Sequence, residues 1–263
     1  MMTIQNYVRA GSLEEAWQLN QKRNNRILGG GMWLRLSGGN IHTAIDLCDL
    51  HLDQVEETED AFLIGAMTSL RALEMHEALN AATCGAIRDA VRDIVGVQFR
   101  NMATVGGSIW GRYGFSDVLT VLLALDCDVE LYKGGVVPLA QFAGMKKDND
   151  ILVRLIVRKT PRRAAYASVR NQRTDFPVLA LCAAQVGGEI RVSVGARPAK
   201  AVLVRDEAGL LSGGITQESA KAFAAHVSGQ VKTDSNVRGS REYRSRLVRV
   251  LTERCLLSLG GEK

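Results

Sequence analysis

The stretch from Asn101 to Trp110 constrains the fold of this chain more than any other. It carries two adjacent glycines, Gly106 and Gly107, and a polar loop follows it as far as Asp117. The loop opens into the apolar run 118–125. Because glycine has no side chain, a large ligand can lie directly on such a backbone and receive hydrogen bonds from its N–H groups. The stretch therefore predicts a ligand site built from main chain.

A glycine triplet, Gly29–Gly31, is the second candidate for such a site. The residues before it, 26–28, read as a short buried strand, and residues 32–36 read as a helical turn. A strand, a glycine turn and a helical turn together present free N–H groups to an anion such as a pyrophosphate. A plain tight turn is the alternative. Leu34 stands where a dinucleotide fingerprint needs its third glycine, and the chain has no Walker A loop. We expect both glycine clusters to belong to one site.

The composition indicates a globular protein. The chain has 263 residues, enough for one large domain or two ordinary ones, with 46% hydrophobic and 23% charged residues. No apolar run approaches the roughly 20 residues that span a bilayer. A signal peptide has a basic segment followed by an apolar one, and the N-terminus shows no such pattern. We therefore expect a cytoplasmic protein with no membrane partner.

Metal and nucleic-acid sites are not indicated. The five cysteines are far apart, without a C-x-x-C pair, and the four histidines show no ligand spacing, so we expect structural roles and no metal. The net charge of +5 is diffuse and has no aromatic platforms beside it, which argues against nucleic acid. Solvated faces or a protein interface fit this charge better, and an anionic ligand is compatible with it.

The first part of the chain mixes helices and strands. Ser12 and Glu15 form a capping box that begins a helix reaching about Lys22. Apolar spacing predicts an amphipathic helix from about residue 82 to 95, ended by Gly96. Further strands are expected at 43–47, 61–65, 128–132 and 151–157, and a helix near 68. Ser116 or Asp117 is placed to cap the helix that contains Leu119, Leu122 and Leu123, so Asp117 is a cap, a ligand contact or both.

A polar break at Arg158–Arg163 marks the expected domain boundary. Strands follow at 165–170, 176–186 and 189–194, and the pair Gly187–Gly188 is a two-residue hairpin signal. Thr216 caps a helix to about residue 227, and an apolar face from Tyr243 to Cys255 predicts a C-terminal helix. The second part is thus a small antiparallel sheet followed by helices.

The motifs resemble the FAD-binding (medium) subunit of the molybdenum hydroxylases, the family of xanthine dehydrogenase and carbon monoxide dehydrogenase. The matching segments are Val97–Asn101, Ala103–Ile109, Ser116–Asp117 and Leu122–Asp126, with the family's first motif, A-G-G-T-[DS]-L, on Gly29–Leu34 and its C-terminal patterns on Tyr166–Pro177 and Tyr243–Leu251. The resemblance covers nearly the whole chain. The second glycine motif is the specific one, and its position relative to the first strengthens both.

The resemblance implies an α+β fold in two domains. Residues 1–158 would form a two-lobed, PCMH-like FAD-binding domain, with lobes of about 1–52 and 53–158, and residues 159–263 a three-stranded antiparallel sheet with a helical bundle. The implied function is that of an oxidoreductase subunit for electron transfer. Its FAD would take electrons from 2Fe–2S clusters on a small subunit, beside a molybdopterin-binding large subunit, and pass them to NAD or another acceptor. No catalytic acid or base is implied in this chain.

The resemblance also assigns site residues. Gly29–Leu34 would cradle the FAD pyrophosphate with backbone N–H groups. From the other lobe the same role would fall to Thr104, Gly106, Gly107 and Ser108. Asp117 would accept from a ribitol or ribose hydroxyl, because a carboxylate is a strong acceptor. The implied cofactor-binding residues are Leu28, Gly29, Gly30, Gly31, Met32, Trp33, Leu34, Thr104, Gly106, Gly107, Ser108, Ser116, Asp117, Leu152, Ser168 and Arg170.

Four positions depart from the family pattern. Ser108 stands for the usual Asn, Met32–Trp33 for Thr and Asp or Ser, and Ser168 for a Lys whose charge Arg170 or Arg173 would supply. These departures motivate an alternative from another class, a non-catalytic assembly subunit that keeps the fold and has lost FAD. A third reading is an unrelated nucleotide-binding regulatory protein.

Overall fold

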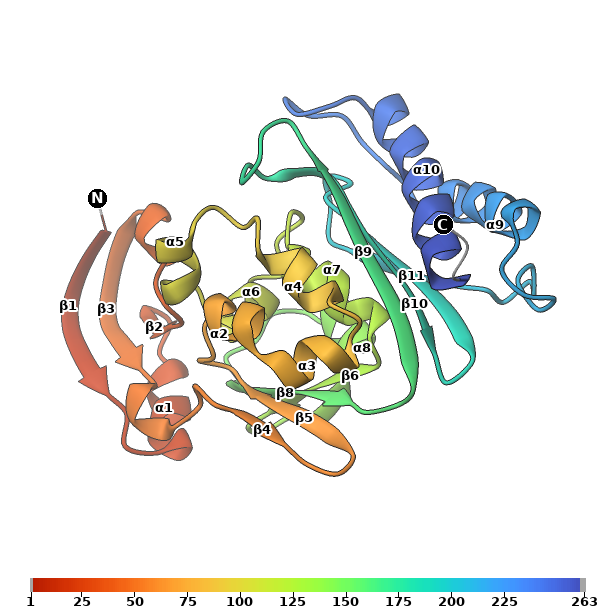
Figure 1. Cartoon of the computed structure of the whole chain (residues 1–263). Helices are drawn as coiled ribbons and strands as arrows, with labels where there is room; N and C mark the ends of the chain where they lie inside the picture. Colours follow the sequence, from red (N-terminus) through yellow and green to blue (C-terminus); the bar gives the residue numbers. More distant parts are fainter. Residues whose placement is uncertain (1, 261–263) are drawn as a thin grey trace. The chain divides into compact units, whose positions relative to one another are not determined.

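The computed structural model describes residues 2–260 of the chain (Figure 1). It divides into two compact units. The first unit contains the chain up to Ala72, together with Val97–Gly111 and Asp128–Arg158. The second contains Leu73–Gly96, Arg112–Cys127 and the chain from Lys159 onward. Each unit is therefore assembled from segments that are far apart in the sequence.

The first unit contains two sheets. A parallel sheet has the order β1-β3-β2, and a five-stranded sheet has the order β4-β5-β8-β6-β7. Their strands are β1 (Met2–Arg9), β2 (Asn25–Leu28), β3 (Gly39–Asp46), β4 (Val55–Glu57), β5 (Ala61–Gly65), β6 (Cys127–Leu131), β7 (Gly135–Pro138) and β8 (Leu152–Arg158). The helices are α1 (Leu13–Asn20), α5 (Val97–Met102), α6 (Val105–Gly111) and α8 (Leu139–Gly144). Two 3-10 turns lie at Leu34–Leu36 and Cys48–Leu50. Helix α2 (Leu70–Met75) begins in this unit and continues into the second.

Helix α1 begins at the predicted capping box. The Ser12 hydroxyl accepts from the Glu15 N–H at 3.1 Å, while the Glu15 carboxylate accepts from the N–H of Gly11 at 2.8 Å. The helix buries Ala16 in a small apolar core with Ile45 of β3, and this core fixes the strand that leads to the glycine triplet.

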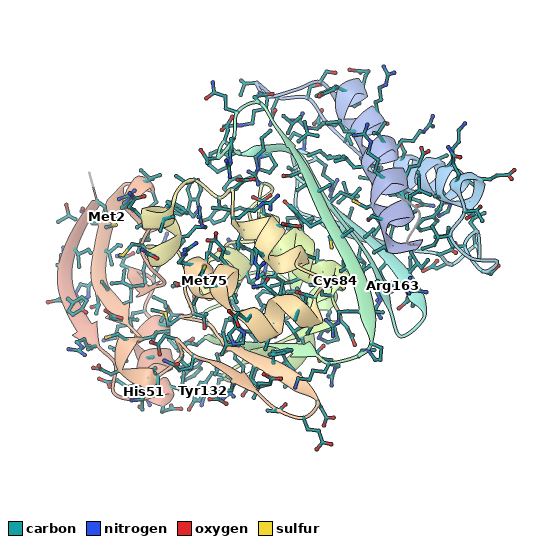
Figure 2. All side chains as sticks on the ribbon, in the orientation of Figure 1. Met2, His51, Met75, Cys84, Tyr132 and Arg163 are labelled. Atoms are coloured by element: carbon teal, nitrogen blue, oxygen red, sulfur yellow. The ribbon has the colours of Figure 1, made fainter. Side chains whose placement is uncertain are left out.

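A polar cluster joins α1 to the turn after β6 within the first unit. Glu14 accepts from the hydroxyl of Tyr132 (labelled in Figure 2) and from the ammonium of Lys133, both at 2.7 Å. The Lys133 ammonium also lies 4.8 Å from the ring centre of Trp17. Hydrogen bonds from Lys133 and Tyr132 lower the pKa of Glu14 to about 2. The charged form of Glu14 is therefore the form that this contact stabilises.

The second unit is organised on an antiparallel sheet of four strands in the order β12-β11-β10-β9. These strands are β9 (Arg162–Arg170), β10 (Pro177–Val186), β11 (Glu189–Gly195) and β12 (Val202–Arg205). The predicted hairpin joins β10 and β11, and both its glycines, Gly187 and Gly188, have positive φ, 58° and 90°. The sheet thus has one strand more than the three expected, because β12 pairs with β11.

Helices cover both faces of this sheet (Figure 1). Helices α9 (Gln217–Gln230) and α10 (Arg241–Gly260) pack on one face, over apolar side chains that include Leu181 and Val192. Helix α7 (Asp117–Ala124), whose residues are all buried, packs on the opposite face. Small residues permit this close approach. A Cβ at Gly195 would lie 2.1 Å from the Thr120 hydroxyl oxygen.

The expected single helix from 82 to 95 is wrong. Two short helices, α3 (Glu77–Ala82) and α4 (Ala86–Val91), occupy this region, and Cys84 (Figure 2) and Gly85 form the turn between them. Both turn residues are left-handed, with φ of 53° and 77°, which a continuous helix does not allow. Ile87 and Val91, which belong to the apolar spacing that predicted one helix, both lie in α4 and are buried.

Candidate functional site

The glycine triplet forms an open turn at the end of β2. Gly30 and Gly31 have φ of 72° and 70°, a conformation that favours glycine. Within residues 2–260, the N–H groups of Gly30, Gly31 and Met32 donate to no protein acceptor. A strand end with unpaired N–H groups, followed by a 3-10 turn at Leu34–Leu36, presents main-chain donors of the kind that bind anions.

The second glycine stretch forms the start of α6, and its N–H groups already have acceptors. Gly106 donates to the carbonyl of Ala66 at 2.8 Å, Gly107 to the Thr104 hydroxyl at 3.1 Å, and Ser108 to the Thr104 carbonyl at 3.1 Å. The expectation that these amides cradle a phosphate therefore needs correction. The hydroxyl of Thr104 keeps a proton that it can donate.

The two glycine stretches meet in the first unit. A Cβ placed on Gly29 would lie 3.1 Å from the Thr104 hydroxyl oxygen and 3.6 Å from the Cα of Gly107. A Cβ on Gly30 would lie 1.8 Å from the carbonyl oxygen of Met102, which no side chain tolerates. The glycines thus allow two backbones to touch. The open N–H groups of the triplet and the Thr104 hydroxyl belong to one locus.

The remaining candidates of the first unit lie around these turns. Leu28 is the last residue of β2. Met32 and Trp33 precede the 3-10 turn, which begins at Leu34, and all three residues are half-buried. Ser108 donates its hydroxyl proton to the Thr104 carbonyl at 3.0 Å, so this side chain offers only acceptor capacity. Leu152 is buried in β8, against which α6 packs.

A second group of candidates gathers at the start of α7 in the second unit. The Ser116 hydroxyl accepts from the Leu119 N–H at 3.1 Å, so Ser116 is the helix cap. This answers the question that the sequence left open, because the Asp117 side chain is not needed as a cap. Asp117 is instead 4% exposed, and its carboxylate faces β9.

Two side chains of β9 hold the Asp117 carboxylate. The Tyr166 hydroxyl donates to Asp117 Oδ1, and Arg170 Nη2 lies 2.9 Å from the same oxygen. Alternation along the strand puts Tyr166, Ser168 and Arg170 on one face, while Ala167 between them packs into the core of the other face. Tyr166 is the residue that the sequence reasoning omitted, although its spacing of two and four from Ser168 and Arg170 is a usable signal.

Burial governs the protonation of this group. It raises the pKa of Asp117 above its ordinary value, and the neighbouring Arg170 cation opposes that rise. Burial also raises the pKa of Tyr166 well above its ordinary value, so the phenol stays protonated and remains a donor. The Arg170 cation and the hydrogen bond from Tyr166 both favour the charged form of Asp117, which is the form that accepts hydrogen bonds.

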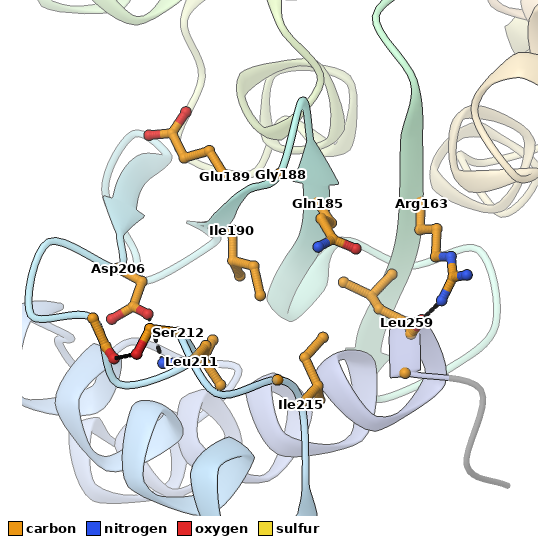
Figure 3. A pocket seen from close by; sticks show the side chains of 13 residues that line it. Arg163, Gln185, Gly188, Glu189, Ile190, Asp206, Leu211, Ser212, Ile215 and Leu259 are labelled. Carbon is orange, nitrogen blue, oxygen red and sulfur yellow. Dashed lines mark hydrogen bonds between the residues drawn. The ribbon is translucent and has the colours of Figure 1, made fainter.

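A separate hollow lies beside the β10–β11 hairpin and the end of α10 (Figure 3), with a volume of about 540 Å³. Several of its polar groups are engaged internally. Arg163 donates to the carbonyl of Leu259 at 2.9 Å, and Asp206 accepts from the N–H groups of Leu210 and Leu211. The Ser212 hydroxyl donates to the carbonyl of Gly209 at 2.7 Å. We therefore assign no role to this hollow.

Within residues 2–260, no group of three or more His, Cys, Asp and Glu side chains is placed to hold a metal ion. The same part of the chain contains no helix that is long and apolar enough to cross a membrane. All five cysteines are free thiols, of which Cys48 and Cys84 are exposed.

Two family models cover almost the whole chain. Residues 2–159 match the FAD binding domain in molybdopterin dehydrogenase, and residues 164–259 match the CO dehydrogenase flavoprotein C-terminal domain. The chain belongs to the FAD-binding medium subunits of the molybdenum hydroxylase family. The family expected from the motifs, its class of oxidoreductase subunits and its cofactor FAD are thereby confirmed.

Relatives support this family membership. This medium subunit is 28% identical over 269 residues to the glyceraldehyde dehydrogenase medium chain of Sulfolobus acidocaldarius, a match that covers 94% of this chain and 95% of that one. It is 25% identical over 254 residues to the uncharacterized protein YgfM of Escherichia coli (strain K12), covering 94% and 93% of the two chains.

Solved structures share the fold. Reconstituted CO dehydrogenase from Oligotropha carboxidovorans contains a chain that superposes with a TM-score of 0.87 at 22% identity, over 98% of each chain. Quinoline 2-oxidoreductase from Pseudomonas putida 86 contains one with a TM-score of 0.84 at 18% identity, over 98% of this chain and 97% of that one. The expected α+β architecture is confirmed.

Proposed function

We propose that this medium subunit uses its FAD to take electrons from 2Fe–2S clusters on a small partner subunit and to pass them to NAD or another acceptor. The small subunit would in turn receive them from a molybdopterin-binding large subunit. The observation that carries the proposal is the meeting of the two glycine stretches, with the N–H groups of Gly30, Gly31 and Met32 left open. Backbone donors of this kind suit a diphosphate.

The open turn and Thr104 would hold the diphosphate of FAD. In this arrangement the N–H groups of Gly30, Gly31 and Met32 donate to phosphate oxygens, and the Thr104 hydroxyl adds one further donor. The role of Gly106 and Gly107 is steric, since their missing side chains let α6 approach Ala66 and Gly29. Lining roles are proposed for Leu28, Gly29, Trp33, Leu34, Ser108 and Leu152.

The second group of residues would bind the sugar part of the cofactor. Asp117 accepts a hydrogen bond from a ribityl or ribose hydroxyl, and its neighbours Ser116, Ser168 and Arg170 shape its surroundings. When bound, FAD supplies the two-electron redox centre, and the protein supplies binding and orientation. We also propose a domain boundary between 158 and 159, lobes of about 1–52 and 53–158, and a cytoplasmic location.

The test is the visible spectrum of the intact complex. Co-expressed subunits are purified by gel filtration, and absorbance is recorded near about 450 nm, where an oxidised flavin absorbs. We expect a flavin band in this spectrum. Under anaerobic conditions, NADH or the reduced form of another acceptor should bleach that band. Reduction of the 2Fe–2S clusters should follow only when the medium subunit is present.

Two results would contradict the proposal. A complete, correctly assembled complex without a flavin band would instead support the assembly subunit that has lost FAD. A flavin band whose reduction never reaches the clusters would retain FAD but remove the proposed electron route.

A further inference from the structure

We propose that Arg170 is a positioning residue that keeps the buried Asp117 carboxylate ionised, so that Asp117 can accept a hydrogen bond from the FAD sugar. The inference rests on the proposed function, in which Asp117 contacts the cofactor. It adds a residue whose charge, rather than any contact of its own with FAD, determines the affinity.

The geometry isolates these charges from solvent. The side chains of Arg170 and Asp117 are 7% and 5% exposed, and 2.9 Å separates Nη2 from Oδ1. A buried carboxylate without a cation takes up a proton, because the low-dielectric interior disfavours the charged form. A protonated Asp117 would donate where the sugar hydroxyl needs an acceptor.

Arg170 is held in place from its other side. Its Nη1 donates to the carbonyl of Asp175, which belongs to the turn between β9 and β10. Its Nε and Nη2 are buried and, among residues 2–260, make no hydrogen bond of good geometry. The guanidinium thus acts on Asp117 mainly through charge, and it links the start of α7 to this turn.

Within residues 2–260, the ionisable groups near this pair include Tyr166, Cys182 and Asp93. Tyr166 of β9 stays protonated, and Cys182 of β10, on the strand next to α7, has a pKa raised well above its ordinary value by burial, so it is neutral. Asp93, after α4, acts on Arg170 and pairs with the exposed Arg173 at 3.0 Å. Arg170 is therefore the cation that balances Asp117.

The test measures the FAD dissociation constant between pH 7 and 9 by titrating flavin-free complex and following flavin fluorescence. We expect a flat profile for the wild-type protein. Arg170→Gln removes the charge and keeps a donor for Asp175. It should weaken binding roughly tenfold to a hundredfold at pH 7, the loss expected for one charge-assisted hydrogen bond. Its affinity should then rise with pH by up to about tenfold per unit, as Asp117 loses its proton.

Three further variants isolate the cause. Arg170→Lys keeps a cation and should retain the flat profile. Arg173→Gln removes an arginine that is 83% exposed from the adjacent turn and should bind FAD like the wild type. In the double variant Arg170→Gln with Asp117→Asn, the pH dependence should vanish, and affinity should equal that of Asp117→Asn alone.

The outcomes separate this inference from the proposed function. A wild-type complex that binds no FAD contradicts the proposed function. If the wild type binds FAD, a flat profile for Arg170→Gln overturns the role of Arg170, as does full additivity of the Arg170→Gln and Asp117→Asn losses. Thermal unfolding of each flavin-free variant identifies any that fail to fold, and Arg170→Lys then carries the test, since loss of its flat profile would also refute the role.

Discussion

Two glycines offer a matched test of the diphosphate site. Gly31 lies in the proposed FAD turn and has φ of 70°, and Gly38 lies in the next loop and has φ of 67°. A Cβ on either glycine would meet no protein atom within 4 Å. Alanine at either position therefore introduces the same backbone strain and no clash, and only Gly31→Ala puts a methyl group where we place the cofactor.

The size of the strain follows from the backbone. A left-handed conformation costs an L-residue about 1–2 kcal/mol. For a chain of this length, that corresponds to a decrease in Tm of roughly 2–8 °C in the flavin-free protein. We expect Gly31→Ala and Gly38→Ala to lower Tm by the same amount within this range. Gly30→Ala should be far more disruptive, because its Cβ would lie 1.8 Å from the Met102 carbonyl oxygen.

Affinity for FAD should separate the matched pair. Gly31→Ala should weaken binding by at least about tenfold, equivalent to 1.4 kcal/mol, whereas Gly38→Ala should bind like the wild type. Fluorescence titration of flavin-free complex measures both constants. Equal affinities for the two variants would refute our assignment of the turn, since equal strain has already been allowed for.

Two further predictions concern stability. Gly195→Ala should destabilise the second unit by about 1–3 kcal/mol, because its Cβ would overlap the Thr120 hydroxyl. As the control, Gly229→Ala at an exposed position in α9 should be neutral or stabilising. Equal Tm values for the two variants would contradict the packing of α7. The folded pKa of Glu14, about 2, lies below its ordinary value of 4.5, so its stabilising contact with Lys133 is complete above about pH 4.5 and is lost as pH falls toward 2. Glu14→Gln should therefore differ from the wild type in denaturant midpoint at pH 6 and converge with it near pH 2, and a constant difference across this range would contradict the assignment.

Local signals in the sequence identified much of the fold. The hairpin at Gly187–Gly188 was predictable because both positions require positive φ, which glycine adopts without strain. The caps at Ser12 and Thr216 were predictable because each side chain bonds the N–H three residues ahead. The strand β12 was missed because it is only four residues long and its pairing with β11 is what defines it.

The site was predictable in its residues and less so in its hydrogen bonds. The glycine motifs identified both turns. Only the fold shows that the Gly106 N–H already donates a hydrogen bond to the Ala66 carbonyl. Nothing near Gly106 in the sequence indicates a partner from a segment so distant. Likewise, the pairing of Asp117 with Tyr166 and Arg170 depends on how β9 lies against α7.

Amide hydrogen exchange tests the central claim most directly, because it reports on the N–H groups themselves. The experiment compares the complex with and without FAD, and it follows the amides of Gly30, Gly31 and Met32 beside those of Gly106 and Gly107. We predict that FAD slows exchange at residues 30–32, whose N–H groups have no protein acceptor, and leaves residues 106 and 107 protected in both states. New protection confined to residues 106 and 107, or no change at residues 30–32, would contradict the account.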